Sequence, residues 1–190
     1  VELDDISKKF GSDVANLVDG VTKMEVIQEL SDQTNTGRSN QDAKAKSLRK
    51  MMLAMVDDVR VVLIKLCDRL HNMRTLESMR AEKQKRIATE TLEIFSPLAN
   101  RLGVWQIKWE LEDLSFRYIE PEIYKSIAKK LAERRVDREG FINDFINDLA
   151  AALADDGVDA EIRGRAKHIY SIWSKMQKKG LEFEQLFDVR

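Results

Sequence analysis

A mostly apolar run from Val61 to Leu76 constrains the fold of this chain more than any other stretch. It also carries the polar residues Asp68, His71, Asn72 and Thr75. Their spacing of i, i+3, i+4 and i+7 places them on one face of an α-helix. Because an ionised aspartate is costly to bury unless it is paired or bound to a metal, this face is a candidate functional site. From spacing alone, a solvated face or a hydrogen-bonded cluster is the more ordinary interpretation.

The same run resembles the last metal-binding helix of HD-type phosphohydrolases. It is more similar still to the hydrolase domain of the RelA/SpoT family, whose pattern reads ILIKLADRxHNMRTL. A second stretch, residues 164–176 (GRAKHIYSIWSKM), resembles the opening nucleotide-binding motif of that family's synthetase domain, G-R-x-K-H-x-x-S-I-x-x-K-M. The two motifs come in the family's order, and residues 92–103 between them also fit. The resemblance therefore covers nearly the whole chain.

The composition suits a helix-rich protein and disfavours two classes. Apolar residues make up 43% of the 190 residues, and only two prolines and eight glycines interrupt helices. No stretch approaches the ~18 apolar residues of a membrane span, so we expect no membrane partner. The net charge of −1 disfavours bulk nucleic-acid binding, so we expect no direct nucleic-acid contact in this stretch. Any contact with a ribosome would be made by parts of the protein that lie outside these 190 residues.

The single cysteine, Cys67, cannot form an internal disulfide, so a reducing and cytoplasmic compartment is expected. The acidic start, VELDD, does not have the pattern of a signal peptide. Because Cys67 lies beside Asp68 within an apolar run, we expect its side chain to be buried.

Helical periodicity dominates the first three-quarters of the chain, which predicts a mainly α fold. Helices are expected over residues 4–30, 43–56, 81–95, 104–118, 121 to about 138 and 141–154. The first of them should break near Phe10-Gly11, and residues 31–42 should form a loop. Asp57-Asp58 is expected to open the motif helix. Ser96 is expected to cap a helix with Pro97 at its first position, and Gly103 to end it. Trp105, Trp109 and Phe116 are expected to pack. The resemblance implies an incomplete HD-type helical bundle over residues 1–95, followed by connecting helices over 96–155.

The end of the chain is expected to be α/β. Asp156-Gly157 signals a turn, and residues 158–163 alternate between apolar and charged, which is typical of a half-buried strand. Residues 164–180 are expected to be helical after their first positions, and residues 183–190 to begin a second strand. The resemblance implies that residues 156–190 are the first strand–helix–strand of an α/β nucleotidyltransferase-like synthetase domain. Since two strands do not make a stable sheet, we expect the chain to be one stretch of a longer polypeptide.

The resemblance implies a hydrolase site that uses a divalent metal, manganese. Asp68 corresponds to the family's final metal ligand and acts with Asn72 in catalysis, while Asn72 and Thr75 correspond to residues that contact the nucleotide. The family's other ligands belong to an HDxxED motif upstream of the segment matching residues 10–21, and we expect the chain to begin after it. One ligand does not hold a catalytic metal, so this stretch alone is expected to be inactive.

Residues 162–180 contain six Lys or Arg and no Asp or Glu, which predicts an amphipathic helix with a cationic face. The cationic face would contain Lys167, Ser171, Lys175 and Lys178, and the apolar side Ile169, Ile172, Trp173 and Met176. A solvated basic face is the ordinary alternative. The resemblance implies that the donor ATP is bound by Arg165, Lys167, His168, Ser171 and Lys175. It also implies that Asp188 is the first magnesium carboxylate and a catalytic residue of the synthetase.

The function implied is (p)ppGpp metabolism in the stringent response. One site would transfer pyrophosphate from ATP to the ribose 3′-hydroxyl of GTP or GDP, and the other would hydrolyse the 3′-pyrophosphate of (p)ppGpp. The intact motif from Asp68 to Leu76 favours a hydrolase-competent parent, whereas residues 108–114 (KWELEDL) are more similar to the synthetase-dominant branch. Two alternatives stay open: a synthetase-only enzyme with a regulatory pseudohydrolase domain, and a helical interaction scaffold.

Overall fold

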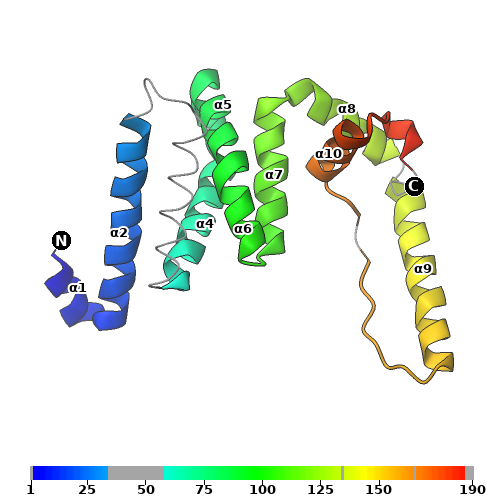
Figure 1. The fold of residues 1–190 in the computed structure, drawn as a ribbon, viewed down its shortest axis with the longest axis horizontal. Helices are drawn as coiled ribbons and strands as arrows, with labels where there is room; N and C mark the ends of the chain where they lie inside the picture. The colour runs from blue at the N-terminus through cyan, green and yellow to red at the C-terminus, as the bar shows by residue number, and fades with distance from the viewer. Residues whose placement is uncertain (1, 34–57, 134, 165, 187–190) are drawn as a thin grey trace. The chain divides into compact units, whose positions relative to one another are not determined.

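The fold is helical, as Figure 1 shows. The computed structural model describes residues 2–33, 58–133, 135–164 and 166–186, and every regular element among them is a helix or a helical turn. The mainly α class is confirmed for these residues. Contacts divide the chain into two compact units, Val1–Ser115 and Phe116–Arg190, each described here by itself. None of the described helices is long and apolar enough to cross a membrane.

The first unit begins with two helices joined at a glycine. Its elements are α1 (Leu3–Phe10), α2 (Ser12–Gln33), α4 (Val59–Arg74), η2 (Leu76–Ser78), α5 (Ala81–Glu90), η3 (Thr91–Phe95), α6 (Ser96–Arg101) and α7 (Trp105–Ile119), the last of which runs into the second unit. Gly11, with φ of 89°, makes the predicted break between α1 and α2. The loop predicted at residues 31–42 is wrong at its start, because α2 continues to Gln33. The rest of that loop and the helix predicted over 43–56 lie outside the described residues.

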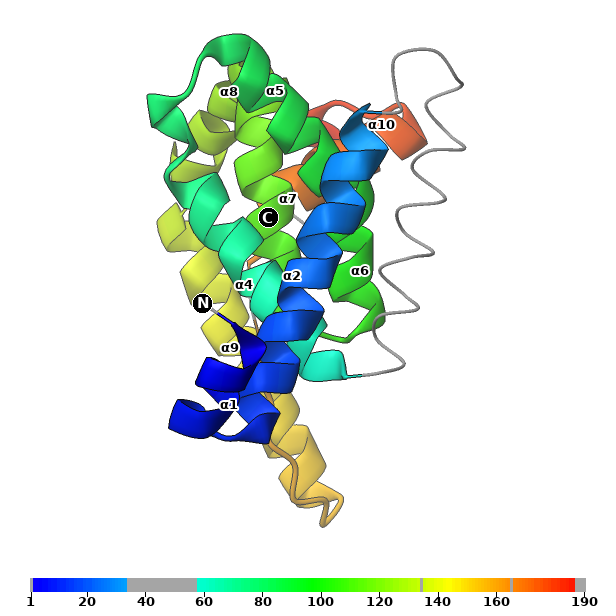
Figure 2. The ribbon, with the colours of Figure 1, turned by 90° about the vertical axis from the view of Figure 1, so that its left-hand side faces the viewer.

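The core of the first unit lies along one side of α4. Leu66, Leu70 and Met73 are buried, as their spacing predicts. Figure 2 shows α2 beside α4, and Gly20 on α2 makes this close approach possible. A Cβ atom at Gly20 would lie 2.7 Å from Val61 Cγ2 on α4, closer than real side chains come. The apolar side of α4 is therefore fixed by packing, and its polar side is left for other contacts.

The helix from α5 to α6 is continuous and contains a π-helical turn, η3, which the sequence did not predict. The Ser96 N–H bonds to the Thr91 carbonyl, five residues back. The predicted N-cap role of Ser96 is wrong, because its backbone is helical and its buried Oγ donates to Glu112 Oε1 at 3.1 Å. The wide turn lies just before Pro97, whose ring would clash with the carbonyl four residues back in a regular α-helix.

Two expectations about the ends of α6 and α7 have different outcomes. Gly103 ends α6, as predicted, with φ of 72° and with the Val104 N–H bonded to the Ala99 carbonyl at 3.0 Å. Phe116 near the end of α7 is buried. Trp105, at the start of α7, is 51% exposed and makes a tilted ring contact with Trp109, so its predicted packing is only partial.

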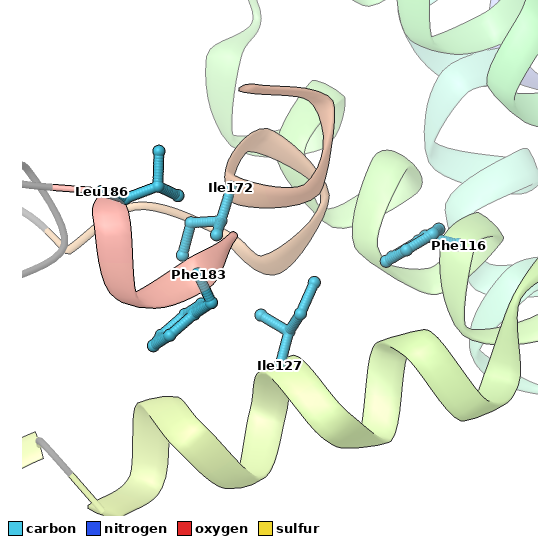
Figure 3. Packing of buried hydrophobic residues seen from close by; sticks show 5 residues of the cluster. All are labelled: Phe116, Ile127, Ile172, Phe183 and Leu186. Atoms are coloured by element: carbon cyan, nitrogen blue, oxygen red, sulfur yellow. The ribbon is translucent and has the colours of Figure 1, made fainter. Parts of the chain in front are cut away.

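The second unit contains the end of α7, then α8 (Pro121–Glu133), α9 (Arg135–Asp155), α10 (Ile169–Lys179) and the short turn η4 (Phe183–Gln185). Pro121 starts α8 as predicted, but α8 ends earlier than predicted and α9 already begins at Arg135. Figure 3 shows the buried core of this unit, in which Ile127 of α8 points toward Ile172 and Phe183. Its members are Phe116, Ile127, Ile172, Phe183 and Leu186.

The strand predicted over residues 158–163 is wrong. The turn at Asp156-Gly157 forms as predicted, with φ of 72° at Gly157, but the residues after it run as an irregular segment. A strand exists only when a neighbouring backbone accepts its hydrogen bonds, and no such neighbour occurs among the described residues. The second predicted strand is wrong at its start, where Phe183–Gln185 forms a 3₁₀ turn, and residues 187–190 lie outside the described residues.

Candidate functional site

The helix that carries the candidate hydrolase residues, α4, starts at a well-formed cap. The Asp58 carboxylate accepts from the backbone N–H of Arg60 at 2.9 Å and also pairs with the Arg60 guanidinium. These hydrogen bonds from Arg60 hold the pKa of the Asp58 carboxyl below its usual value. The prediction that an aspartate opens this helix is confirmed at Asp58, while Asp57 lies outside the described residues.

Asp68 and Asn72 lie together on the exposed face of α4. Asn72 Nδ2 donates to Asp68 Oδ1 at 3.4 Å, and Lys65 Nζ donates to Asp68 Oδ2 at 3.3 Å. The Asp68 side chain is 48% exposed, whereas that of Lys65 is 9% exposed. The carboxylate therefore has one neutral and one cationic partner, both through long hydrogen bonds, and some of its lone pairs stay open to solvent.

The other two polar residues of this face lie at the end of the helix. Thr75 is the C-cap residue of α4, and its hydroxyl donates to the carbonyls of His71 and Asn72 at 3.1 and 3.4 Å. Both Thr75 and His71 are exposed. The shared face predicted from the spacing is confirmed, and all four of its polar residues are exposed.

Buried charged residues beside this face were not predicted as part of a site. Arg69 is 8% exposed and forms two hydrogen bonds of 3.3 Å with Glu90 of α5. Its guanidinium carbon also lies 4.0 Å from the centre of the Phe95 ring. The only sequence signal was a charged residue at an inward position of an apolar helix, which requires a partner that the sequence does not identify.

A second ion pair joins the end of α4 to α7. Arg74 donates to both carboxylate oxygens of Glu110, at 2.5 and 2.7 Å, and this pairing raises the pKa of Arg74. Farther along α7, the buried Glu112 accepts from Ser96 and Lys108, each at 3.1 Å. The charged stretch of residues 108–114 thus supplies contacts to the helices around α4, which its composition alone did not reveal.

The expectation for Cys67 is wrong, because its side chain is exposed. The apolar run has a polar side that includes position 67, one residue before Asp68. Helix rotation of about 100° per residue places it away from the buried side chains of Leu66 and Leu70.

The basic segment of the second unit forms a shorter helix than predicted. α10 begins at Ile169 with His168 as its N-cap residue, so Lys167 precedes the helix and does not belong to its cationic face. Ser171 and Lys175 are half-buried on α10, and Lys178 is exposed. Gly180, with φ of 61°, ends the helix.

The apolar side of α10 is confirmed. Ile172 is fully buried, and Ile169, Trp173 and Met176 pack against the same core. The Trp173 ring lies 4.7 Å from that of Phe116 and 5.6 Å from that of Tyr170, centre to centre. This packing fixes the rotation of α10 and so determines which side its polar residues take.

Two predicted site residues, Arg165 and Asp188, lie outside the described residues. The described residues also contain no group of three or more His, Cys, Asp or Glu side chains able to hold a metal. Asp68 is a suitable donor in kind, because Mn²⁺ prefers carboxylate oxygens, but a single donor is an incomplete set.

Comparison with known proteins agrees with both motifs. Residues 1–105 match the model of the HD domain family. The GTP pyrophosphokinase of Escherichia coli is 48% identical over 190 residues, which is 100% of this chain and 25% of that protein. The chain belongs to the RelA/SpoT family of HD-domain proteins. This membership confirms the family predicted from the residues.

Other RelA/SpoT relatives carry two kinds of name. The GTP pyrophosphokinase of Myxococcus xanthus is 46% identical over 98% of this chain and 24% of its own length. The guanosine-3′,5′-bis(diphosphate) 3′-pyrophosphohydrolase of Haemophilus influenzae is 44% identical over 97% of this chain and 26% of its own length. The chain thus spans about a quarter of the curated relatives it matches, and the similarity includes both motifs.

Proposed function

We propose that this chain is part of an enzyme of (p)ppGpp metabolism in the stringent response. One site hydrolyses the 3′-pyrophosphate of (p)ppGpp, and a second transfers pyrophosphate from ATP to GTP or GDP, in the cytoplasm. Residues 1–95 belong to the HD-type hydrolase domain, residues 96–155 are connecting helices, and residues 156–190 begin the synthetase domain. The relatives' names, which include a pyrophosphokinase and a pyrophosphohydrolase, support both reactions.

The observation that carries the hydrolase half is the placement of Asp68. Within the segment that matches the HD domain, its carboxylate lies on the exposed face of a helix whose opposite side is buried. Asn72 holds one carboxylate oxygen, and Thr75 lies one turn farther on. A carboxylate ligand with a neighbouring amide and hydroxyl suits a metal-assisted phosphohydrolase, because the amide and hydroxyl can bind the nucleotide.

Manganese would be bound by Asp68 together with ligands from elsewhere in the full-length protein. When bound there, the metal would lower the pKa of a coordinated water and offset negative charge on the phosphoryl group. Residues of this chain would orient the metal ligand: Lys65 and Asn72 each donate a hydrogen bond to one oxygen of the Asp68 carboxylate. Asn72 and Thr75 would contact the nucleotide.

The synthetase half rests on the α10 region. Lys167 and His168 precede the helix and Ser171 lies in its first turn, next to a helix N-terminus, which favours phosphate. Lys175 lies one turn farther along the helix. With Arg165, these residues would bind the donor ATP, and Asp188 would bind magnesium. Positioned cations and a metal are the main requirements of phosphoryl transfer.

A synthetase-only enzyme with a pseudohydrolase domain is the second candidate. It is favoured by the names of two of the relatives above, both GTP pyrophosphokinases, and by the resemblance of residues 108–114 to the synthetase-dominant branch. The intact Asp68–Asn72 pair favours the bifunctional enzyme.

The test is Asp68→Ala in the full-length protein, with both reactions assayed. We expect hydrolysis of (p)ppGpp to be abolished and synthesis to be retained, because Asp68 belongs to the hydrolase site alone. Asp144→Ala, at an exposed carboxylate of α9, is the control and should leave hydrolysis unchanged. Synthesis without hydrolysis in the unmutated protein would support the pseudohydrolase, and absence of both reactions would favour a scaffold.

A further inference from the structure

Arg69 of α4 combines deep burial, an ion pair and an aromatic contact. It is 8% exposed, its two hydrogen bonds to Glu90 measure 3.3 Å, and its guanidinium lies over the Phe95 ring at 4.0 Å. Burial of an arginine is tolerated only with such partners. All three residues lie in the first unit, and Arg69 directly follows Asp68.

The π-helical turn η3 explains how one helix offers both partners. Glu90 and Phe95 are five residues apart, at the two ends of this turn. In a regular α-helix, residues five apart point about 140° away from each other. A π turn takes more residues to close, so residues five apart come to nearly the same side. The turn therefore brings carboxylate and ring together on the Arg69 guanidinium. Pro97, two residues after the turn, disfavours a regular α-helix there.

We propose that Arg69, held by Glu90 and Phe95, is the positioning residue of the hydrolase site and fixes the orientation of Asp68. Apolar packing of Leu66, Leu70 and Met73 keeps α4 in the core, but such packing is non-directional and tolerates small rotations of the helix. A bidentate arginine–carboxylate contact is directional. It stops the rotation of α4 about its own axis, and a metal ligand must be held within about 10–20° of its productive direction.

The inference rests on the proposed hydrolase function and adds a residue set to it. Arg69 has no part in binding substrate, since its guanidinium is turned to α5 and η3, away from the exposed face. Replacing a whole buried ion pair with well-packed apolar residues is often neutral or stabilising, so fold stability alone is a weak explanation of the Arg69–Glu90 pair.

The test uses the full-length protein with Glu90→Gln, which removes the charge and keeps the size of the side chain. Electron paramagnetic resonance of free Mn²⁺ measures metal affinity without any turnover, and kcat and KM for (p)ppGpp are measured separately. We expect Mn²⁺ affinity or the kcat of hydrolysis to fall by about 10- to 100-fold, the range for residues that orient a metal ligand. The KM for (p)ppGpp and the rate of synthesis should change little.

Phe95→Leu is the second variant, which keeps apolar packing and removes the ring under the guanidinium. It should shift the same two quantities in the same direction, by less. The matched control is Glu122→Gln, which breaks an exposed ion pair with Lys125 and should change neither.

A lower melting temperature with unchanged Mn²⁺ affinity and unchanged kcat would show that Arg69 only stabilises the fold, and would overturn the proposal. Failure of the proposed function looks different: Asp68→Ala would then leave hydrolysis and Mn²⁺ affinity unaltered. In that case the positioning role falls with it.

Discussion

The two helices that carry candidate site residues, α4 and α10, are held in place by different forces. α4 combines a buried apolar side with ion pairs to two other helices, through Arg69 and through Arg74. α10 is held by aromatic and aliphatic contacts around Ile172 and Trp173. The difference matches the chemistry proposed for each. A side chain that binds a metal must be held in one orientation, whereas lysines that bind phosphate act as point charges on flexible side chains.

The first prediction concerns the two cores, each truncated at a fully buried residue. Met73→Ala and Ile172→Ala remove side chains of similar size that are both 0% exposed. Each should lower the free energy of unfolding of its own unit by about 2–5 kcal/mol. Hydrogen exchange of the full-length protein should show faster exchange in α4 for the first variant and in α10 for the second.

Because the two positions belong to different compact units, their effects should be separable. Equal loss of protection in both helices from either substitution would contradict the division into two units. A conservative pair, Met73→Leu and Ile172→Val, serves as the control and should cost about 0.5–1.5 kcal/mol each.

The second prediction concerns the basic helix. Lys175→Glu in the full-length protein should raise the KM for ATP and slow synthesis, since it replaces an attractive charge with a repulsive one. A charge-assisted contact to phosphate contributes about 1.5–3 kcal/mol, so the loss should be about 10- to 100-fold. Steady-state kinetics at varied ATP measures it, and hydrolysis should change little.

Lys129→Glu on α8 is the matched control, because Lys129 is exposed and lies outside both motifs. It should leave both reactions nearly unchanged. If Lys129→Glu slowed synthesis as much as Lys175→Glu, general charge would explain the basic segment, and the contrast between a placed contact and a solvated face would be lost.

Sequence periodicity predicted the two helices well and their surroundings poorly. The buried side of α4, its aspartate cap, the apolar side of α10 and the stop at Gly103 all follow from rules that act within a few residues. Both motifs also predicted the family correctly. These features are local, so a single sequence contains them.

What was missed depends on contacts between distant residues. The partner of Arg69 is 21 positions away, and the π turn that presents it has no known signature beyond the proline that follows. The strand expected at residues 158–163 needs a neighbouring strand, which alternation of residue types does not supply. The prediction for the cationic face failed at its start: the helix begins only at Ile169, so Lys175 lies on the helix as predicted and Lys167 does not.

The third prediction concerns Asp58, the N-cap residue of α4, and should give the smallest change in stability. Hydrogen bonds from Arg60 lower the pKa of Asp58 in the folded state, so folding favours the ionised carboxyl. This contribution to stability is present above the unfolded pKa of about 3.9 and is lost as pH falls through the lower folded pKa. Asn is also a good N-cap residue, so Asp58→Asn keeps the cap and removes the charge.

Thermal unfolding of the chain and of Asp58→Asn is measured from pH 6 down to pH 2. The difference in stability between the two gives the contribution of the ionised Asp58 carboxyl. The unmutated chain should be slightly more stable than the variant above about pH 5, and the difference should shrink steadily below about pH 4. Arg60→Gln should give a smaller pH dependence of the same sign, because it removes the side-chain hydrogen bonds to Asp58 and leaves the backbone N–H that also lowers its pKa. A difference in stability that does not vary with pH would mean that the charge of Asp58 does not stabilise α4. The ion pairs of Arg69 and Arg74 with other helices would then be the electrostatic contacts that hold this helix in place.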